Sequence, residues 1–544
     1  MKQKNTFFKI ILPLSLFFLL ARLAQLQIFA GEKYKQLAEN NRIRQIKIKG
    51  PRGIIFDRHG EILAENQPVF KIEEGNSDEV VSRDEALRLQ AEGRDENLFI
   101  DYLRSYPQGE VFGHVTGYLG QLSEAEVQSE KCPLRPQGEA SKAQNCELSD
   151  WVGRTGIEEY YETKLRGKDG GELVEVDTLG KILRRMGREE PLPGENLSLA
   201  LDADLQRVAA LQMAGKKGAV VATNPQTGEV LLLYSSPSFN PNYFLSPKFS
   251  EAVSRLINDK ENQPLFNRVV AGLYPPGSTF KIVTATAALE EGKITKNTLI
   301  NDPGVIYVGS YRYSNWYFTG YGRTEGDINI IRAIKRSTDT FFYKVGEMVG
   351  VADLTAWAKK FGLNKTTDID LGGEVPGFVP DEEWKKEATG EGWFLGNTYH
   401  LAIGQGDLAL TPLDVNLMTG VVANEGKICR PRMLKVAGEP IKCQEIGVKS
   451  ETLKIIKEGM VEACSSGGTA YPFFDFKPKV ACKTGTAEYV ASDGKMKTHA
   501  WFSAFAPSED PTIVVTVLVE GGGEGSSVAA PIAKEILKEF FKVR

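Results

Sequence analysis

The sequence predicts an α+β architecture with an antiparallel sheet, flanked by helices, in its C-terminal part. Residues 218–241 (GAVVATNPQTGEVLLLYSSPSFNP) hold two apolar β-type runs around a Pro-Gln-Thr-Gly turn, which is typical of a hairpin. The end of the chain holds two more apolar runs, HAWFSAFAP and PTIVVTVLVEGGG, and then the amphipathic APIAKEILKEFFKVR. Strands at both ends with helices between them favour a sheet assembled from the two ends of one domain.

Ahead of this region the chain has a second, smaller α/β pattern. GEKYKQLAENNRIRQIKIKG is typical of a helix that leads into a strand with alternating isoleucines, and PRGIIFDRHGEILAEN of a strand, a turn and a strand. Ser123 and Glu126 have the spacing of a helix capping box. We therefore expect an N-terminal domain at residues 31–210 and a larger domain at residues 211–544.

The first thirty residues predict a membrane anchor. Lys2, Lys4 and Lys9 precede or begin a long apolar run, and residues 6–30 are numerous enough to cross a bilayer. A cleavable signal peptide is the alternative, but no small-x-small cleavage site follows the run. The lysines would keep residues 1–5 in the cytoplasm, with residues 6–30 in the inner membrane, so everything after residue 30 is expected outside the cytoplasm.

Length and charge narrow the possible functions. The 544 residues are too many for one compact domain and favour two or three. The net charge is −5, from 66 basic and 71 acidic residues, and no long basic stripe occurs. A nucleic-acid partner is therefore not expected.

The six cysteines are consistent with a location outside the cytoplasm, where disulfides form. Six cysteines allow fifteen pairings, so their number does not determine the connectivity. The polar Pro/Gly/Ser loop between Cys132 and Cys146 favours a bridge that closes it. Sequential pairing of the other four cysteines remains open, and their spacing is not that of a zinc site.

A serine and a lysine three residues apart lie in LYPPGSTFKIVTA, after a Pro-Pro-Gly turn and before an apolar run. If a helix begins here, Ser278 and Lys281 share one face, and a desolvated Lys281 can hydrogen-bond Ser278 and act as its base. The alternative is that Ser278 is only the N-cap of the helix and Lys281 is solvated. The pair alone does not decide between the two.

Two further strings favour the catalytic interpretation. KRSTDTFFY carries a second serine, Ser337, with the acidic Asp339 two positions on. VACKTGTAEYV carries, in a strand context, Lys483, Thr484, Gly485 and Thr486. On a sheet edge Gly485 would leave room for a peptide beside the strand, and Lys483 would supply positive charge. The order S-x-x-K, S-x-D, K-T-G along one domain predicts a serine acyl-transfer site.

With these motifs the chain resembles a class B penicillin-binding protein, and within that class the elongation-type group called penicillin-binding protein 2. The resemblance extends over almost the whole chain, through LQIFAGEKY, PRGIIFDRHGEILAEN, VGRTGIEEYYE, LRGKDG, GEVLLLYSSPSFNPN, LAIGQGDLALTPL and HAWFSAFAP. NDPGVIYVGSYRYSNW and STDTFFY favour the elongation group over the division group. The resemblance implies a transpeptidase domain like that of the serine β-lactamases on an elongated pedestal domain of the penicillin-binding protein dimerisation type.

The resemblance also implies roles for the motif residues. Ser278 would attack the carbonyl of the penultimate D-Ala of a stem pentapeptide, and Lys281 would accept its proton. Ser337 would relay a proton to the departing D-Ala near Lys483, while the N–H groups of Ser278 and Thr486 would form the oxyanion hole. The substrate would be held by Lys483, Asp339, Thr484, Gly485 and Thr486. An amine from a neighbouring stem would then take the acyl group, and β-lactams would trap Ser278.

Partners follow from the same resemblance. Class A relatives carry a glycosyltransferase domain, whereas residues 31–210 are too few for one and have a different pattern. The glycan is therefore expected to come from a separate membrane polymerase of the SEDS family, which would contact the anchor and the pedestal, within a complex of elongation proteins. No cofactor is expected.

Some elongation-type relatives hold a zinc ion beside the site through two aspartates, a histidine and a cysteine. Asp302 matches one of these positions, but Asn315, Tyr321 and Thr338 stand at the other three. Because these three side chains are poor zinc ligands, no zinc is expected here.

Several alternatives share the motifs. A D,D-carboxypeptidase or a β-lactamase uses the same acyl chemistry, although the long segment after the anchor is superfluous for a soluble hydrolase. A division-type transpeptidase and a β-lactam receptor or catalytically silent scaffold are the others. His400 and His499 are expected to be structural, because no G-x-S-x-G string accompanies them.

Overall fold

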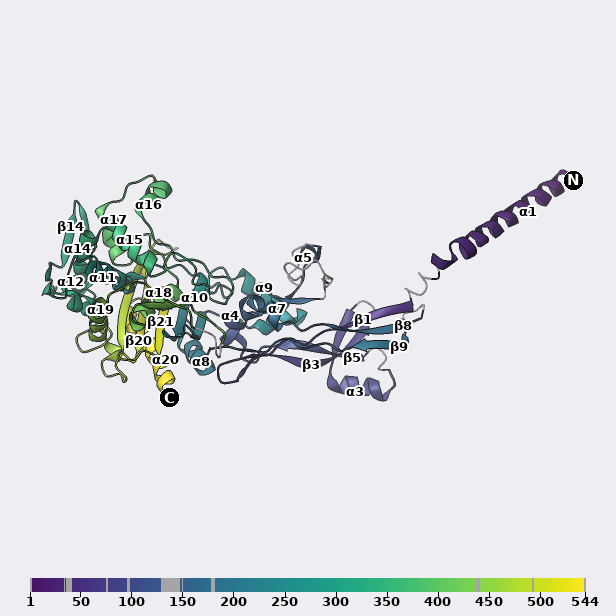
Figure 1. Ribbon diagram of the computed structural model, residues 1–544, viewed down its shortest axis with the longest axis horizontal. Coiled ribbons are helices and arrows are strands. Elements are labelled where there is room, and N and C mark those ends of the chain that lie inside the picture. The colour runs from purple at the N-terminus through teal and green to yellow at the C-terminus, as the bar shows by residue number, and fades with distance from the viewer. Residues whose placement is uncertain are drawn as a thin grey trace. The chain divides into compact units, whose positions relative to one another are not determined.

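The computed structural model describes residues 2–33, 35, 42–74, 77–94, 98–128, 147–148, 150–177, 182–435, 441–491 and 494–542. Cys132 and Cys146, for which the sequence favours a disulfide, lie outside the described residues. The chain divides into two compact units, whose helices and strands are labelled in Figure 1. The first comprises Met1–Gly53, Pro68–Tyr102 and Lys164–Glu195, and the second Ile54–Gln67, Leu103–Thr163 and Asn196–Arg544.

The first unit begins with helix α1 (Lys2–Ala24), which continues into a π-helical turn, η1 (Gln25–Phe29). Over Ile11–Phe29 its mean hydropathy is 1.7, and no part of this stretch is buried inside the structure. Large apolar side chains such as Phe17 and Leu19 are exposed. Such exposure is unfavourable in water but suits contact with lipid tails. The helix therefore fits a single-pass membrane anchor.

The rest of the first unit is mainly antiparallel β-structure. A three-stranded sheet has β8 between its neighbours, and its strands are β1 (Ile43–Ile48), β8 (Gly170–Val176) and β9 (Ile182–Glu189). The alternating isoleucines predicted β1 correctly. The unit also contains the second half of β3 (Ile62–Glu74), which pairs with β4 (Ser77–Val81), the helix α3 (Arg83–Ala91) and the start of β5 (Leu98–Ser105), another partner of β3.

The second unit opens with short elements before its main sheet. They include β2 (Ile55–Phe56), β10 (Leu197–Ser198), β6 (Leu119–Gln121), α5 (Glu124–Gln128) and β7 (Trp151–Gly153). β2 turns back into the start of β3, which confirms the predicted strand, turn and strand. The predicted capping box is also confirmed, because Ser123 N donates to Glu126 Oε2 and Glu126 N donates to Ser123 Oγ.

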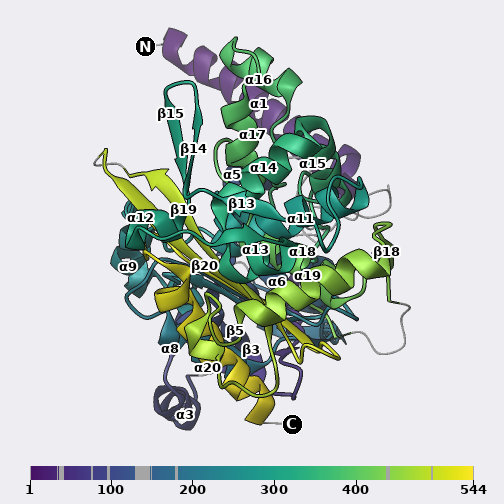
Figure 2. The same cartoon turned by 90° about the vertical axis from the view of Figure 1, so that its left-hand side faces the viewer.

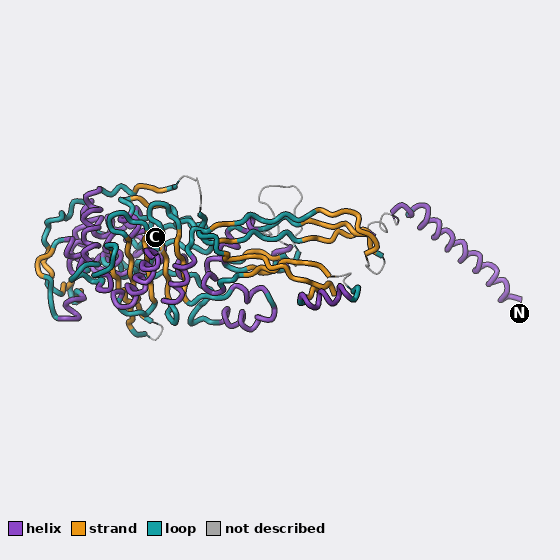
Figure 3. The backbone as a smooth tube through the Cα atoms, turned by 90° about the horizontal axis from the view of Figure 1, so that it is seen from below, coloured by secondary structure: helices purple, strands orange, loops and turns teal. Residues whose placement is uncertain are grey.

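A five-stranded antiparallel sheet is the centre of the second unit, and Figure 3 shows its strands flanked by helices. Its order is β12–β11–β21–β20–β19. The strands are β11 (Gly218–Thr223), β12 (Val230–Ser236), β19 (Ala481–Val490), β20 (Met496–Ala506) and β21 (Ile513–Val519). The hairpin β11–β12 and the C-terminal strands lie side by side, as the sequence predicted. β19, which carries the K-T-G string, is an edge strand.

Strand alternation divides the apolar residues between two cores, one on each face of the sheet. Trp501 and Phe505 of β20 pack with one set of helices, whereas Phe502 between them packs with the other. The first set includes α11 (Lys281–Glu290), α13 (Ile330–Arg336), α14 (Asp339–Val349), α15 (Val351–Lys360), α17 (Leu395–Ala402), α18 (Pro412–Ala423) and α19 (Ser450–Ala463), of which Figure 2 shows several together on one side of the sheet. The second set is α8 (Ala203–Gln212) and α20 (Ala530–Lys542). This arrangement confirms the predicted α+β class.

Two disulfides lie in the described part of the second unit, and both follow sequential pairing. Cys429 and Cys443 face each other across β17 (Lys427–Cys429) and β18 (Cys443–Glu445). Cys464, at the end of α19, is bonded to Cys482 in β19, directly before Lys483. The second bridge therefore ties a helix of the first core to the strand that carries the K-T-G string.

Candidate active site

The segment with Ser278 is a single 3₁₀ turn, η5 (Gly277–Phe280), and helix α11 begins only at Lys281. Pro276 is the N-cap of the turn, so the interpretation of Ser278 as a helix N-cap is wrong. The tight turn leaves Ser278 partly exposed, whereas the Lys281 side chain is completely buried. The expectation of a solvated Lys281 is therefore also wrong.

The turn is held against the edge strand by glycine at position 277. Gly277 has φ +54°, and a Cβ there would lie 3.0 Å from the carbonyl oxygen of Thr486. A side chain would thus be strained by the backbone and obstructed by β19. Two hydrogen bonds fix the segment further, from Gly277 N to Gly404 O at 2.8 Å and from Trp501 Nε1 to Pro275 O at 3.0 Å.

The second motif lies where α13 ends and α14 begins. Ser337 is the C-cap of α13 with φ +54°, in the left-handed region that glycine usually occupies at helix ends. Such a conformation costs a non-glycine residue roughly 1–3 kcal/mol and is typical of functional positions. The reversal turns the Ser337 side chain toward both site lysines.

The two lysines of the first and third motifs meet at the Ser337 hydroxyl. Lys483 Nζ donates to Ser337 Oγ at 2.7 Å, and Lys281 Nζ donates to the same oxygen at 3.3 Å and to Ser337 O at 2.8 Å. Lys281 Nζ also forms an ion pair with Asp339 Oδ1 at 2.6 Å. In the part of the chain that the structure describes, no hydrogen bond joins Lys281 to Ser278. The expected Lys281–Ser278 contact is thus replaced by contacts with the second motif.

Burial affects the pKa of both lysines. It lowers the pKa of the Lys281 ammonium, while the charge and the hydrogen bond of Asp339 oppose that shift. It also lowers the pKa of Lys483 well below its usual value, and the positive charge of Lys281 lowers it further. A neutral amine, which a proton acceptor requires, is therefore more accessible here than for a lysine in water.

The third motif occupies the edge strand β19. Lys483 and Gly485 face the first core, and Thr484 and Thr486 face the other way. A Cβ at Gly485 would lie 2.9 Å from Trp501 Cβ and 3.1 Å from Thr279 Cγ2, so glycine lets the turn η5 pack closely on the strand. The space that a side chain at position 485 would need is thus filled by the protein's own turn and by Trp501, and the room for a bound peptide beside the strand stays a prediction.

Three residues near the motifs were not singled out from the sequence. The Thr484 hydroxyl donates to Thr469 Oγ1 at 2.8 Å, Gln405 Nε2 donates to Thr486 O at 3.5 Å, and Trp316 N donates to Asp339 Oδ2 at 3.1 Å. LAIGQG and the tryptophan were visible strings, but no spacing rule connects them to the motifs. Only the fold shows that these three residues form hydrogen bonds with the motif residues.

The residues at the zinc positions of some relatives do not fit a zinc ion. Both oxygens of Asp302 already accept hydrogen bonds from protein groups. Asn315 is one of those donors, Tyr321 is largely exposed, and Thr338 offers only a neutral hydroxyl, which makes no hydrogen bond within the described residues. Zinc prefers cysteine, histidine and carboxylate ligands, so this set supplies one suitable ligand out of four.

His400 and His499 are both packed against aromatic rings. His499 is buried between the rings of Tyr274 and Tyr489 and accepts a hydrogen bond from Gly521 N, and burial lowers its pKa to about 4. Burial also lowers the pKa of His400, which contacts the ring of Tyr313. Both side chains have the surroundings of packing residues.

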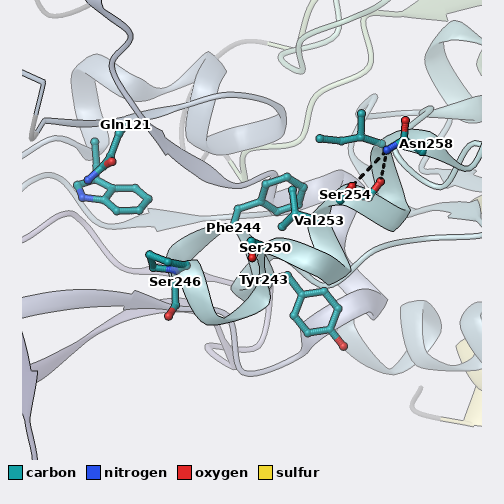
Figure 4. A pocket seen from close by; sticks show the side chains of 11 residues that line it. Gln121, Tyr243, Phe244, Ser246, Ser250, Val253, Ser254 and Asn258 are labelled. Atoms are coloured by element: carbon teal, nitrogen blue, oxygen red, sulfur yellow. Dashed lines mark hydrogen bonds between the residues drawn. The ribbon is translucent and has the colours of Figure 1, made fainter.

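A separate surface pocket of about 480 Å³ lies elsewhere in the second unit (Figure 4). Tyr243 and Phe244 of the 3₁₀ turn η3 (Pro241–Leu245) and the side chains of helix α9 (Ser250–Asn258) form most of its wall. None of the predicted site residues lines it. The predicted catalytic residues therefore do not lie in this cavity; Lys483 belongs to the edge strand β19, and Ser278 to the turn packed on that strand.

Two family models match the chain. Residues 218–538 match the penicillin binding protein transpeptidase domain, and residues 97–199 match the penicillin-binding protein dimerisation domain. Among curated proteins, the peptidoglycan D,D-transpeptidase MrdA of Acinetobacter baumannii is 32% identical over 97% of this chain and 85% of its own length. The protein of that name from Escherichia coli K12 is 32% identical over 95% of this chain and 91% of its own length.

Solved structures resemble the chain over nearly its full length. One is described as a complex between penicillin-binding protein 2 and MreC from Helicobacter pylori, with a TM-score of 0.80, 29% identity and coverage of 92% of this chain and 99% of that one. Another is described as structural coordination of polymerization and crosslinking by a peptidoglycan synthase complex. Its TM-score is 0.77 at 30% identity, with coverage of 100% of this chain and 99% of that one.

The expectation that residues 302, 315, 321 and 338 hold no zinc ion can be tested by metal analysis. Purified full-length protein should contain far less than one zinc ion per chain by elemental analysis, because Asp302 is the only suitable ligand of the four. Asp302→Asn should have the same low content. One tightly held zinc ion per chain that disappears in Asp302→Asn would contradict this expectation.

Proposed function

The chain belongs to the class B penicillin-binding proteins of the elongation type, and we propose that it crosslinks peptidoglycan through an acyl-enzyme on Ser278. Its activity is that of a peptidoglycan D,D-transpeptidase. The observation that carries the residue assignment is the Ser337 hydroxyl, which lies between two buried lysines beside the turn that exposes Ser278. Burying two lysine amines is unfavourable unless hydrogen bonds and an opposite charge replace the water, and here Ser337 and Asp339 supply them.

In the first step, Ser278 Oγ bonds to the carbonyl carbon of the penultimate D-Ala, and Lys281 accepts the hydroxyl proton. Lys281 is one turn further along the same segment, and its lowered pKa makes the neutral amine available. The N–H groups of Ser278 and Thr486 donate hydrogen bonds to the carbonyl oxygen and stabilise its developing negative charge. The bond to the terminal D-Ala nitrogen then breaks.

The departing D-Ala needs a proton on its nitrogen, and Ser337 is the group we assign to deliver it. Both lysines donate to Ser337 Oγ, at 2.7 and 3.3 Å, so its lone pairs are occupied. Its single hydroxyl proton is then left to point away from the lysines, toward substrate. Lys483 and Lys281 can restore that proton, which joins the three motifs in one proton pathway.

The edge strand supplies the binding site for the end of the stem peptide. β19 has no partner strand on its outer side in the described sheet, so an extended peptide can pair with it. The Lys483 amine can donate hydrogen bonds to the terminal carboxylate, Thr484 and Thr486 give hydroxyls, and Asp339 and Gly485 lie beside these groups. An amine from a second stem then attacks the acyl carbon, which forms the crosslink and frees Ser278.

Labelling with a fluorescent penicillin tests the nucleophile. Wild type should form a covalent adduct, Ser278→Ala should form none, and Lys281→Ala should acylate at least about a hundredfold more slowly, as loss of a general base does. Ser450→Ala, an exposed serine on α19, is the matched control and should label normally. Persistent labelling of Ser278→Ala would refute the assignment. In intact spheroplasts, labelling by a penicillin that does not cross the inner membrane tests the proposed orientation.

Product analysis of stem peptides separates transpeptidation from hydrolysis in the same preparation. Crosslinked dimers are expected, and free D-Ala without dimers would indicate a carboxypeptidase.

The charge at position 339 gives a pH prediction. Asp339 raises the pKa of Lys281 against the lowering effect of burial, so Asp339→Asn should lower that pKa further. Neutral Lys281 is then present at lower pH, and the acid limb of the pH profile of acylation should move to lower pH. The profile is measured with the fluorescent penicillin, with the exposed Asp327→Asn as control. An acid limb that stays in place or moves up would show that Asp339 does not tune this lysine.

We also propose that α1 anchors the chain with its N-terminus in the cytoplasm and that the chain works with a SEDS-family glycan polymerase. A similar solved structure is described as a peptidoglycan synthase complex that coordinates polymerization and crosslinking. Arg22 lies in the apolar stretch, where its guanidinium donates to Gln25 Oε1, and a charged residue at such a place is typical of a contact with another membrane helix.

An anchor exchange tests this partnership. The full chain should stimulate glycan synthesis by the polymerase in proteoliposomes, and a chain whose residues 2–29 are replaced by an unrelated single-span helix should do so less. Equal stimulation by both chains, with equal penicillin labelling, would show that the anchor makes no specific contact.

A further inference from the structure

The carboxylate of Asp302 is buried near the second motif. Among the described residues it forms no hydrogen bond with a residue of the three motifs. Asp302 ends β13 (Ile300–Asp302) and is 2% exposed. Its Oδ1 accepts hydrogen bonds from Gly304 N at 2.9 Å and from the Thr340 hydroxyl at 2.6 Å. Its Oδ2 accepts from Asn315 Nδ2 and from Glu325 N, both at 2.9 Å. One side chain thus joins four separate stretches of chain.

One of those stretches is the start of α14, which carries Asp339. Thr340, the second residue of this helix, is fully buried, and its hydroxyl is bonded to Asp302. The Asp302 carboxylate therefore holds the first turn of α14 in place through this hydrogen bond. Asp339 is the residue next to that contact.

A second path runs through Asn315. Its Oδ1 accepts a hydrogen bond from Asp339 N at 3.3 Å, and the following residue, Trp316, donates its N–H to Asp339 Oδ2 at 3.1 Å. The two segments hold each other, with each side chain accepting from the backbone of the other. The remaining oxygen of Asp339 is then directed to Lys281 Nζ, at 2.6 Å.

Asp302 determines which way the Asn315 amide faces. A carboxylate that accepts hydrogen bonds cannot donate one, so the NH₂ group of Asn315 must face Asp302. The amide oxygen then faces Asp339 N. An asparagine at position 302 would turn an NH₂ group toward groups that are themselves donors, and one buried donor would lose its partner.

We propose that Asp302 is a positioning residue for acyl transfer, which holds Asp339 against Lys281 through Thr340 and Asn315. The inference rests on the proposed function, because it assumes that Lys281 serves Ser278. It assigns the reaction a hydrogen-bonded support made only of protein groups, at the place where the side chains do not suit a metal ion. Within the described residues, no group of three or more His, Cys, Asp or Glu side chains is arranged to hold a metal ion.

Acylation kinetics with a fluorescent penicillin test the proposal on the full-length protein. The dependence of the rate on penicillin concentration separates the dissociation constant of the first complex from the first-order acylation constant, and the burst amplitude gives the active fraction. Asp302→Asn should lower the acylation constant about tenfold or more, as small displacements of catalytic groups do, with the dissociation constant within about twofold of wild type.

Two substitutions at position 340 provide a matched pair that does not depend on the behaviour of Asp302→Asn. Thr340→Val keeps the shape but removes the hydroxyl and should lower the acylation constant about threefold or more, because Asp302 loses one of its four donors. Thr340→Ser keeps the hydroxyl and should recover most of the rate. Asp327→Asn, an exposed aspartate paired across β13 and β16 (Gly326–Ile328) with Asn301, is the control and should acylate like wild type.

A double variant tests the route through Asp339. If Asp302 acts through Asp339, Asp302→Asn combined with Asp339→Asn should be little slower than Asp339→Asn alone. Losses that multiply fully would overturn the proposal. A normal acylation constant in Asp302→Asn and Thr340→Val, or a loss that appears only in the active fraction, would also overturn it. Labelling of Ser278→Ala would instead refute the proposed function, so the two failures are distinguishable.

Discussion

The burial of two lysine amines around one serine hydroxyl is the constraint on which this site depends. Lys281 and Lys483 are both 0% exposed, and both donate to Ser337 Oγ. Removing a charged amine from water is strongly unfavourable unless hydrogen bonds and an opposite charge replace the water. Asp339 is the single carboxylate bonded to Lys281, and Lys483 has no carboxylate partner among the described residues. The pair therefore favours loss of a proton, which is the state that acyl transfer needs.

The fold stabilises this arrangement by placing the lysines within apolar surroundings that other residues maintain. Lys281 is the first residue of α11, whose following residues are almost all buried in the core on one face of the sheet. Lys483 lies in β19 and faces the same core, while its neighbour Cys482 faces the other core and is bonded to Cys464. Two glycines, at positions 277 and 485, let the turn and the strand approach closely enough to bring both lysines to Ser337.

Much of this structure was predictable because the relevant signals are local. The hairpin near residue 218, the two C-terminal strands and the capping box at Ser123 each depend on residues a few positions apart, and all were confirmed. The turn that begins with Pro275 was harder. Its proline and glycine pattern indicated a helix start, but the structure has a 3₁₀ turn there, with Pro276 as its cap and Gly277 close to Thr486, so Ser278 is not the cap. The hydrogen bonds of Lys281 were also unpredictable, because they join residues 56 and 58 positions apart.

The sequence by itself determined the fold class, the three motifs and the apolar N-terminal helix, because composition, periodicity and short spacings carry those signals. It also determined that the zinc positions of some relatives hold Asn315, Tyr321 and Thr338 in this chain. Only the tertiary structure decided how the motifs combine: Ser337 rather than Ser278 receives the hydrogen bonds of the lysines, and Asp302 holds Asn315 and Thr340 behind Asp339. The physical reason is that hydrogen bonds between buried groups depend on distance and direction in space, and these are set by the packing of the sheet and its helices.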